Sequence, residues 1–222
     1  MASLKRENIS DKLVDIIAKK VIRNEWKSGD PIYESRLSQE YGISRSPVRD
    51  ALHQLKRLRL VEQTEKGSYR VTELTVPFVQ QLYDTVNLFY QYAFSEAAKK
   101  ATPANLAEMR RLLTRLEASI DEDDFELYLA NVSRFAEKIL QVAGNRVIEQ
   151  MALELMPTAE RAQWASITYL PEQLRKAVSH LTEGYEMIAA GKPKAAASAF
   201  ETFAFTHKTL ILEQLSGKGK TP

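Results

Sequence analysis

The sequence predicts a mainly α-helical protein: a small N-terminal part with three helices and a β-hairpin, followed by an all-α bundle of six to seven helices. Three observations predict this class. Apolar residues recur at helical spacing through most of the 222 residues. Strand-like segments occur at residues 60–72. Proline or glycine stands at most boundaries between helical segments, where these residues favour helix starts and ends.

The first two helices are predicted over residues 9–25 and 34–41. Residues 27–31 between them are rich in turn formers and end the first helix. The second helix places Leu37 on its buried face, and Gly42 follows it as a C-terminal glycine. The apolar residues of the first helix lie at helical spacing: Ile9, Leu13, Ile16, Ile17 and Val21.

The third helix completes a helix-turn-helix. Ser46 is expected as its N-cap, with Pro47 at the first helical position. Because four apolar residues then follow at i, i+3, i+4 and i+7 spacing, one face of this helix is expected to be buried. These residues are Val48, Ala51, Leu52 and Leu55.

A β-hairpin follows the third helix directly. Residues 60–64 and 68–72 are strand-like, and Gly67 supplies the positive φ of the turn. A helix-turn-helix followed by a hairpin is a winged helix, so residues 1–74 are predicted to be a winged helix-turn-helix DNA-binding domain. Residues 1–75 hold 15 Lys and Arg against 11 Asp and Glu, whereas the remainder holds 16 against 18. This uneven charge favours an anionic partner at one end of the chain.

The start of the third helix holds the residues best suited to contact DNA. Its first turn contains Ser44, Arg45, Ser46 and Arg49, while its apolar residues face the other way. Arginine at the N-terminal end of a recognition helix reaches guanine O6 and N7, and serine hydroxyls with helix N–H groups hold phosphates. The alternative for this segment alone is a solvated helix start with ordinary caps. The hairpin and the basic charge favour DNA binding.

Residues 8–73 closely resemble the winged-helix domain of the GntR family of bacterial transcription regulators. The densest match is YGISRSPVRDAL at residues 41–52, against a family pattern close to G-V-S-R-T-P-V-R-E-A-L. The family usually places arginine directly after Glu34, where this chain has Ser35, and Arg36 is rotated about 100° from that position.

The resemblance implies specific roles at the DNA. Arg45 and Arg49 would contact bases and phosphates, and Lys66 with Gly67 would form the wing tip in the minor groove. The full set of implied DNA-binding residues is Glu34, Ser35, Arg36, Ser44, Arg45, Ser46, Pro47, Arg49, Lys66 and Gly67.

Residues 75–215 are predicted to be helical throughout. A long first helix is followed by helices that start at Thr102-Pro103, Phe125, Arg146, Pro171 and Pro193. The acidic residues 121–124 are interpreted as a solvated turn rather than a metal loop. In the helix from Arg146, an inward face is predicted for Val147, Ile148, Met151 and Leu155. Residues 216–222 are expected to be a disordered tail.

This region resembles the FCD effector domain of the FadR-type branch of the GntR family. Phe135 to Asn145 resembles the pattern F-H-x-x-L-x-x-A-x-G-N, with the apolar Ile139 and Val142 at its leucine and alanine positions and with Ala136 in place of its histidine. Residues 188–192 match the stretch before the last helix. The resemblance implies an all-helical effector-binding and dimerisation domain over residues 75–215.

Composition excludes several classes of protein. With no cysteine, disulfides, thiolate metal sites and cysteine catalysis are absent. No apolar run reaches the roughly 18 residues of a membrane span, and the N-terminus has no secretory pattern. We therefore expect a cytoplasmic protein with no membrane partner.

The leading functional hypothesis is a ligand-responsive transcription regulator, of the repressor type, that binds a short palindromic DNA operator as a homodimer. A small molecule in the helical bundle would change its operator affinity. An enzyme acting on the bundle's ligand is an alternative, although no catalytic constellation is visible. A helical adaptor that has lost DNA binding is the other alternative, against which the intact Arg45 and Arg49 argue.

The effector pocket is where the chain departs from its apparent relatives. Many FCD domains hold a divalent metal with one carboxylate and three histidines, but the matching positions here are Val132, Ala136, Leu181 and Phe203. We therefore expect no metal or other cofactor, and a more apolar or aromatic effector than a small carboxylate. His207, one turn beyond Phe203, and Asn131 are further candidates for the lining. The predicted pocket comprises Tyr83, Val86, Asn87, Tyr90, Val132, Phe135, Ala136, Leu181, Phe203 and His207.

Overall fold

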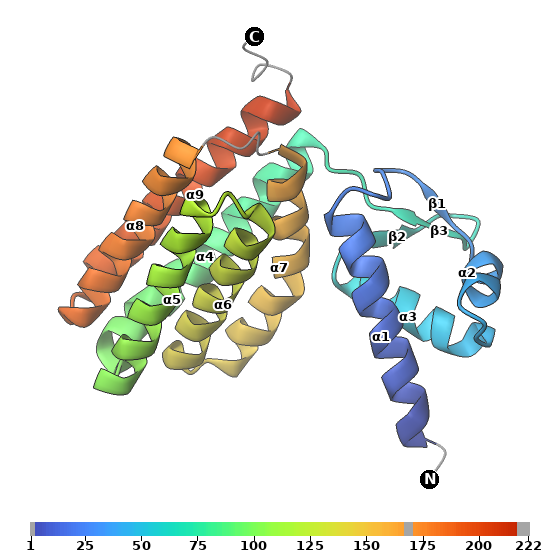
Figure 1. Ribbon diagram of the computed structural model, residues 1–222, viewed down its shortest axis with the longest axis horizontal. Coiled ribbons are helices and arrows are strands. Elements are labelled where there is room, and N and C mark those ends of the chain that lie inside the picture. The colour runs from blue at the N-terminus through green and yellow to red at the C-terminus, as the bar shows by residue number, and fades with distance from the viewer. Residues whose placement is uncertain (1–2, 167–170, 217–222) are drawn as a thin grey trace. The chain divides into compact units, whose positions relative to one another are not determined.

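The computed structural model describes residues 3–166 and 171–216 (Figure 1). The chain divides into two compact units, of which the first comprises Met1–Thr75 and Glu154–Ala165, and the second comprises Val76–Leu153 and the chain from Ser166 onward. None of the helices in the described ranges is long and apolar enough to cross a membrane. The tail predicted to be disordered lies, beyond Ser216, outside the described residues.

The first unit is a winged helix, as the sequence predicts. Its two outer strands, β1 and β2, both pair antiparallel with the central strand β3, and Val61 lies opposite Val71 in the hairpin. The two-residue strand β1 was not predicted, because it is too short to show alternation and lies in the turn-rich segment. The elements are α1 (Ser3–Ile22), β1 (Pro31–Ile32), α2 (Glu34–Glu40), α3 (Arg45–Arg57), β2 (Val61–Gln63) and β3 (Tyr69–Val71).

The predicted apolar face of α3 is confirmed, but its predicted start is wrong. Val48, Ala51, Leu52 and Leu55 are completely buried in the core of this unit. The helix begins at Arg45 with Ser44 as its N-cap, so Ser46 lies inside the first turn and Pro47 lies at its third position. Proline is tolerated there because the first N–H groups of a helix have no intrahelical acceptor.

Glycines set both tight turns of the winged helix. Gly42 ends α2 with a φ of +63°, and Gly67 turns the hairpin with a φ of +80°. Both values lie in the left-handed region that only glycine adopts without strain. The predicted positions of the helix-turn-helix turn and of the wing tip are therefore confirmed.

Six helices follow the winged helix in the described part of the chain, and all but the second half of α7 belong to the second unit. Helix α4 packs along α9 and α6, and α8 packs along α9 and α5 (Figure 1). The expected starts of these helices agree with the structure. They are α4 (Val76–Lys100), α5 (Pro103–Asp121), α6 (Phe125–Ala143), α7 (Arg146–Ser166), α8 (Pro171–Ala189) and α9 (Pro193–Leu215).

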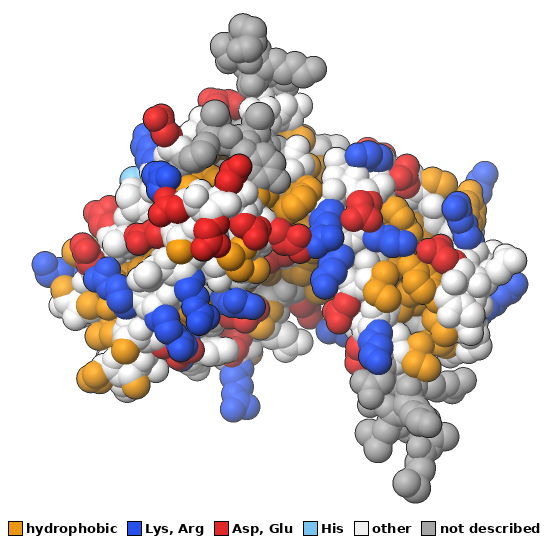
Figure 2. All heavy atoms as spheres, in the orientation of Figure 1, with side chains coloured by type: hydrophobic (Ala, Val, Ile, Leu, Met, Phe, Trp, Pro, Cys, Tyr) orange, Lys and Arg blue, Asp and Glu red, His pale blue; other side chains and the backbone are white. Residues whose placement is uncertain are grey.

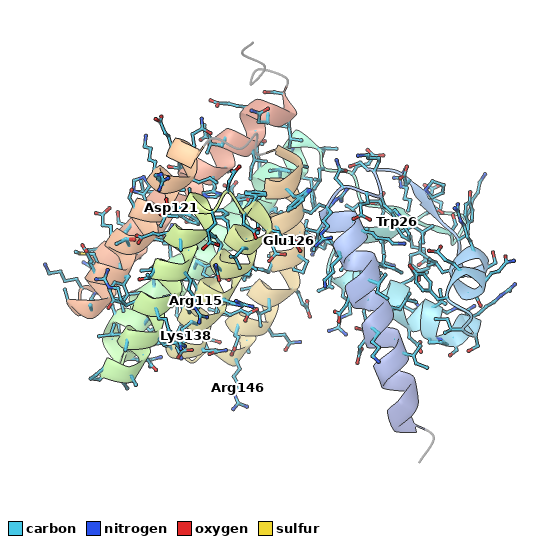
Figure 3. All side chains as sticks on the ribbon, viewed as in Figure 1. Trp26, Arg115, Asp121, Glu126, Lys138 and Arg146 are labelled. Carbon is cyan, nitrogen blue, oxygen red and sulfur yellow. The ribbon has the colours of Figure 1, made fainter. Side chains whose placement is uncertain are left out.

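Side-chain caps fix the starts of two bundle helices. The Thr102 hydroxyl accepts a hydrogen bond from the Asn105 N–H at 3.2 Å, and the Asp124 carboxylate accepts one from the Leu127 N–H at 2.9 Å. The acidic turn is thus a helix start, as predicted. In Figure 2 acidic side chains gather near this turn, where Figure 3 labels Asp121, and basic side chains gather farther along the same face.

Helix α7 differs from its prediction. Val147 and Met151, expected to face inward, are 68% and 49% exposed, whereas Ile148 and Leu155 are half-buried. The buried face instead consists of small or polar residues, all but Ala152 in the second half of the helix. These are Ala152, Thr158, Ala159, Arg161, Ala162 and Gln163.

Arg161 is the most unusual of these residues, because its guanidinium is buried and forms no ion pair with a carboxylate of the described residues. It is 1% exposed, and its two Nη atoms donate hydrogen bonds to the Thr72 carbonyl at 2.7 Å and to the Ser28 hydroxyl at 3.0 Å. Burial lowers the pKa of Arg161 to about 10, so it remains charged at neutral pH. One turn earlier, the Thr158 hydroxyl donates to the Leu58 carbonyl at 2.6 Å. The second half of α7 is therefore part of the winged-helix unit.

We predict that Arg161→Ala lowers the free energy of unfolding by about 2–4 kcal/mol, because it leaves a cavity and removes charged hydrogen bonds to a buried carbonyl. Denaturant unfolding of the full chain measures this. Arg134→Ala on α6 removes an exposed arginine and is expected to change stability by less than about 0.5 kcal/mol. Equal stability of the two variants would contradict the packing role of Arg161.

Candidate DNA interface and effector pocket

Residues from α2, α3 and the wing meet around one surface hollow of the winged-helix unit. Its volume is about 240 Å³. Four of the residues predicted to bind DNA line it: Glu34 and Ser35 from α2, Arg45 from α3 and Gly67 from the wing. Segments more than 30 positions apart in the chain thus converge on one surface, as a groove-binding site requires.

Arg49 lies one turn beyond Arg45 and is held at the surface by Glu34. Its Nη2 is 3.2 Å from the Glu34 carboxylate, and its side chain is 59% exposed. The Glu34 hydrogen bond raises the pKa of Arg49, so the guanidinium is always charged. An exposed ion pair of this kind is weak, so a DNA phosphate can take the place of the carboxylate.

The other predicted residues divide into exposed and buried. Ser44, Ser46 and Lys66 are exposed, and in the described part of the chain the Ser44 hydroxyl makes no capping hydrogen bond. Pro47, in contrast, is buried with the apolar face of α3. Its side chain therefore offers no surface to DNA, and we leave it out of the proposed interface.

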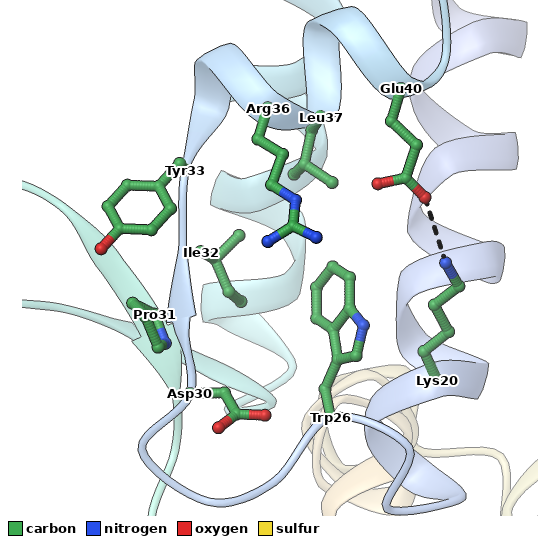
Figure 4. Close-up of a pocket in the computed structure, with 9 residues that line it drawn as sticks. All are labelled: Lys20, Trp26, Asp30, Pro31, Ile32, Tyr33, Arg36, Leu37 and Glu40. Carbon is green, nitrogen blue, oxygen red and sulfur yellow. Dashed lines mark hydrogen bonds and ion pairs between the residues drawn. The ribbon is translucent and has the colours of Figure 1, made fainter.

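Arg36 belongs to a different surface from Ser35. It extends from α2 toward Trp26 in a separate hollow of about 400 Å³ (Figure 4). Across this hollow the Lys20 ammonium pairs with Glu40 at 3.4 Å and lies 5.6 Å from the centre of the Trp26 ring. Ser35 and Arg36 thus diverge, as the rotation of about 100° per residue predicts.

The interior of the bundle contains a layer of contacting aromatic rings. The ring centroids of Phe94 and Phe200 are 4.9 Å apart, and those of Phe94 and Phe135 are 6.3 Å apart. These three residues, from α4, α9 and α6, are called the aromatic layer below. Tyr90 stacks on Phe200 at 5.1 Å, and Phe200 in turn contacts Phe203 at 5.6 Å.

The predicted effector residues lie on α4, α6, α8 and α9. Tyr90, Phe135, Phe203 and His207 are joined through the ring contacts of this layer, including a Phe203–His207 centroid distance of 4.4 Å. Their exposure differs along the set. Tyr83, Tyr90, Phe135, Leu181, Phe203 and His207 are buried, whereas Val86, Asn87, Val132 and Ala136 are half-buried.

The positions that hold a metal in many FCD domains have no donor atoms in this chain. Val132, Ala136, Leu181 and Phe203 are hydrocarbon side chains, and none can coordinate a cation. Across the described ranges, no group of three or more His, Asp or Glu residues is placed to hold a metal ion. The residues present therefore do not fit the metal that the FCD resemblance implies.

Two buried groups of the bundle have strongly shifted pKa values. Burial lowers the pKa of His207 to about 4, so its imidazole is neutral at physiological pH. Burial also raises the pKa of Tyr128, with a further contribution from nearby Tyr83, so the phenol keeps its proton. Both side chains are therefore uncharged in the interior of the bundle at neutral pH.

Sequence reasoning missed Tyr128 and Arg161. Tyr128 has the helical spacing of an ordinary core residue, and its polar tip gives no signal in a periodic pattern. Arg161 lies outside the inward face predicted for this helix and follows Glu160 in the sequence, so no local pattern distinguishes it from an exposed arginine. Asn131, a further candidate, is buried and donates from Nδ2 to the Arg115 carbonyl at 3.3 Å.

A winged helix joined to an all-α bundle defines a DNA-binding class of protein. Comparison with known families identifies the family within this class. Residues 9–71 match the model of bacterial regulatory proteins of the gntR family, and residues 81–203 match the FCD domain. The chain belongs to the gntR family of bacterial regulatory proteins and carries an FCD domain.

Curated relatives show the same family at low identity. The chain is 25% identical to the HTH-type transcriptional regulator YdhC of Bacillus subtilis, over 61% of each chain. It is 25% identical to the gluconate operon transcriptional repressor of the same organism, over 60% of this chain and 55% of that protein. The matched region thus spans less than two thirds of these two relatives. McbR of Escherichia coli is 28% identical over 76% of this chain and 75% of its own.

Solved structures show the same fold. Escherichia coli McbR/YncC superposes with a TM-score of 0.76 at 18% identity, covering 93% of this chain and 98% of that one. A GntR regulator from Rhodococcus sp. RHA1 gives a TM-score of 0.74 at 17% identity, covering 91% and 97%.

We predict a specific acid response from His207. Its pKa is lower in the folded chain, about 4, than the ordinary value near 6.5. The unfolded chain therefore binds a proton first, and His207 destabilises the fold as pH falls from about 6.5 to 4. Denaturant unfolding at several pH values should show a shallower acid loss in His207→Phe, by on the order of 2–3 kcal/mol at pH 4. Parallel pH profiles for the two proteins would refute the burial of a neutral imidazole.

Proposed function

We propose that the protein is a ligand-responsive transcription repressor that binds a short palindromic operator as a homodimer in the cytoplasm. The observation that supports this proposal most strongly is the convergence of α2, the first turn of α3 and the wing on one surface. The repressors of gluconate and galactonate operons among its relatives support the direction of regulation.

Three parts of this surface have distinct tasks at the DNA. Arg45, at the start of α3, contacts base edges in the major groove, where a guanidinium bonds guanine O6 and N7 together. Arg49 exchanges Glu34 for a phosphate, and the hydroxyls of Ser44 and Ser46 hold neighbouring phosphates. Lys66 and Gly67 follow the adjacent minor groove. Gly67 has no side chain, and no heavy atom of the described residues, its two chain neighbours aside, lies within 4 Å of the position that a Cβ would take. The wing tip can therefore approach the sugar–phosphate backbone closely.

Helix α7 offers a route from effector to operator. Residues Arg146–Leu153 belong to the bundle unit, and Glu154–Ala165 belong to the winged-helix unit. A ligand that favours one arrangement of the bundle therefore acts on a helix that is tied to the DNA-binding unit through Arg161. A coupling free energy of about 1–3 kcal/mol suffices to change operator affinity 5- to 150-fold.

Dimerisation is assigned to an exposed apolar patch of the bundle unit. Leu88 and Tyr92 lie one turn apart on α4, and Val147 and Met151 lie one turn apart on α7; all four are exposed. The two pairs are neighbours, because the Tyr92 hydroxyl accepts a hydrogen bond from Asn145, next to the start of α7. An exposed cluster of large apolar residues is typical of a protein interface, and two winged helices are needed to bind two half-sites.

The DNA interface predicts that Arg45→Ala and Arg49→Ala each weaken operator binding by at least about 1 kcal/mol. The operator is obtained by selection from random DNA, and affinity is measured by fluorescence anisotropy. Because Arg49 contacts a phosphate, its loss should also reduce the number of counterions released on binding by about one, which is measured as a smaller slope of log affinity against log salt.

Arg134→Ala on the bundle serves as the control, since it removes an exposed positive charge outside the winged-helix unit. It should leave affinity unchanged. A folded Arg45/Arg49 double variant with full operator affinity would eliminate the proposed interface. Absence of any selected sequence for the wild-type chain would favour the adaptor alternative.

The dimer assignment predicts that Val147→Asp converts the protein to a monomer, because a carboxylate in an apolar interface loses its hydration. Phe205→Asp is the matched control, since Phe205 is an exposed apolar residue of α9 outside the patch. Sedimentation equilibrium at micromolar concentration should give a dimer for the wild type and for Phe205→Asp. A dimer in all three proteins would place the interface elsewhere.

A further inference from the structure

Buried polar atoms without a hydrogen-bond partner among the described residues occur on five residues of the bundle unit: Asn87, Tyr128, Asn131, Thr182 and His207. Three of these groups lie seven residues along the chain from a member of the aromatic layer. They are the side-chain oxygen of Asn87 on α4, the hydroxyl of Tyr128 on α6 and both ring nitrogens of His207 on α9. Tyr128 and His207 are 0% and 1% exposed. A buried polar atom without a partner lowers the stability of the fold because it has lost its hydration and gained no hydrogen bond, so these groups call for a functional explanation.

The three groups lie on one level of the bundle. Each is seven residues from a member of the aromatic layer along its own helix: Asn87 on α4, Tyr128 on α6 and His207 on α9. Seven residues are almost two complete turns, so each polar residue shares the face of its aromatic partner at a distance of about 10.5 Å along the axis.

The helix directions place all three on the same side of the aromatic layer. Helices α4 and α9 are antiparallel, because Asp84 pairs with Lys208 at 2.6 Å while Phe94 contacts Phe200. Helices α4 and α6 run in the same direction, because Lys100 donates to the Ala143 carbonyl at 2.7 Å. Moving back along α4 and α6 and forward along α9 therefore leads to the same end. Asn87, Tyr128 and His207 are called the polar layer below.

The hydrogen-bonding capacity of the polar layer is mixed. The Tyr128 phenol donates a hydrogen bond and the Asn87 oxygen accepts one. The neutral imidazole of His207 donates from one ring nitrogen and accepts at the other. One turn along α6 from Tyr128, the oxygen of buried Asn131 adds a further unpartnered acceptor. The layer thus matches a molecule that has both a donor and an acceptor.

No charge faces this layer among the contacts that the described residues make. Lys208, next to His207, is paired with the largely exposed carboxylate of Asp84. On the side of the aromatic layer, the ring of Phe203 contacts His207 in a tilted arrangement, with the planes at 43°. A ligand carboxylate at this level would lose its hydration without gaining a cation, which is far more costly than burying a hydrogen-bonded neutral group.

We propose that the polar layer of Asn87, Tyr128 and His207 binds the effector, and that the effector is an uncharged, metal-independent molecule with an apolar or aromatic body and a group that both donates and accepts hydrogen bonds, such as an amide or a hydroxyl. This assignment rests on the proposed function, since it names the ligand class of the same regulator. It explains the unpartnered groups: they lower the stability of the ligand-free chain, and a bound ligand supplies their hydrogen-bond partners.

The first test uses the ligand-free chain. Tyr128→Phe and His207→Phe remove unpartnered polar atoms and keep the ring shape, so Tm at pH 7 should be unchanged or higher. A lower Tm for both variants would show that these groups already belong to a structural network with bound water, and would overturn the proposal. Tyr185→Phe, a buried tyrosine of α8 whose ring stacks against Arg110, is the control outside the layer.

The second test compares two probes of nearly equal shape, benzamide and benzoate. Benzamide is neutral and has both a donor and an acceptor, so at about ten times its Kd it should raise the Tm of the wild-type chain by about 2–5 °C. The rise should disappear in Tyr128→Phe and His207→Phe and persist in Tyr185→Phe. A larger rise with benzoate, a rise with zinc chloride, or no rise with millimolar benzamide would overturn the proposal.

Operator binding by the same samples separates this inference from the proposed function. If benzamide binds through the polar layer but the folded chain selects no DNA, the regulator assignment fails and the ligand class stands. If the chain binds its operator but responds to benzoate instead, the regulator assignment stands and the ligand class is wrong.

Discussion

The buried guanidinium of Arg161 is the interaction that holds the second half of α7 in the winged-helix unit. Its two hydrogen bonds reach residues 89 and 133 positions earlier, the Thr72 carbonyl and the Ser28 hydroxyl. A charge buried without a carboxylate is stable only while such acceptors stay in place. The second half of α7 is therefore fixed to the winged helix, although the helix begins in the bundle.

The interior of the bundle combines two layers: one of closely packed rings, and one of polar groups that we propose as the ligand site. The aromatic layer supplies dense ring contacts, whereas the polar layer, two turns away, contains hydrogen-bonding groups that have no partner among the residues the structure describes. A core built for stability alone would place apolar residues at Asn87, Tyr128 and His207. Binding sites are commonly less stable than their surroundings because their groups are arranged for a ligand that is not always present. The same reasoning explains why the metal positions are filled with hydrocarbon: a partial ligand set would leave a stranded donor or charge.

Local rules of the sequence predicted much of this structure, and long-range contacts account for what was missed. The α3 apolar face, the turns at Gly42 and Gly67, and the Thr102 and Asp124 caps depend on residues a few positions apart, so they could be predicted. The role of Arg161 depends on partners far away in the chain, and no periodic pattern encodes them. Val147 and Met151 show a third case: amphipathic spacing identified an apolar stripe, but not whether that stripe packs inside its own unit or remains at the surface. The DNA-contact set came from motif resemblance; within it, the burial of Pro47 and the separate hollow of Arg36 were visible only in three dimensions.

Selection of bound DNA from a random library, using the full chain with and without the Arg45→Ala/Arg49→Ala pair, tests the central claim most directly. The account predicts that the wild-type chain enriches an inverted repeat with a guanine in each half-site, because two copies each present one recognition helix. The double variant should enrich no such repeat while remaining folded. Enrichment of the same repeat by both proteins, or of a single unrepeated site by the wild type, would contradict the proposed interface or the dimer that uses it.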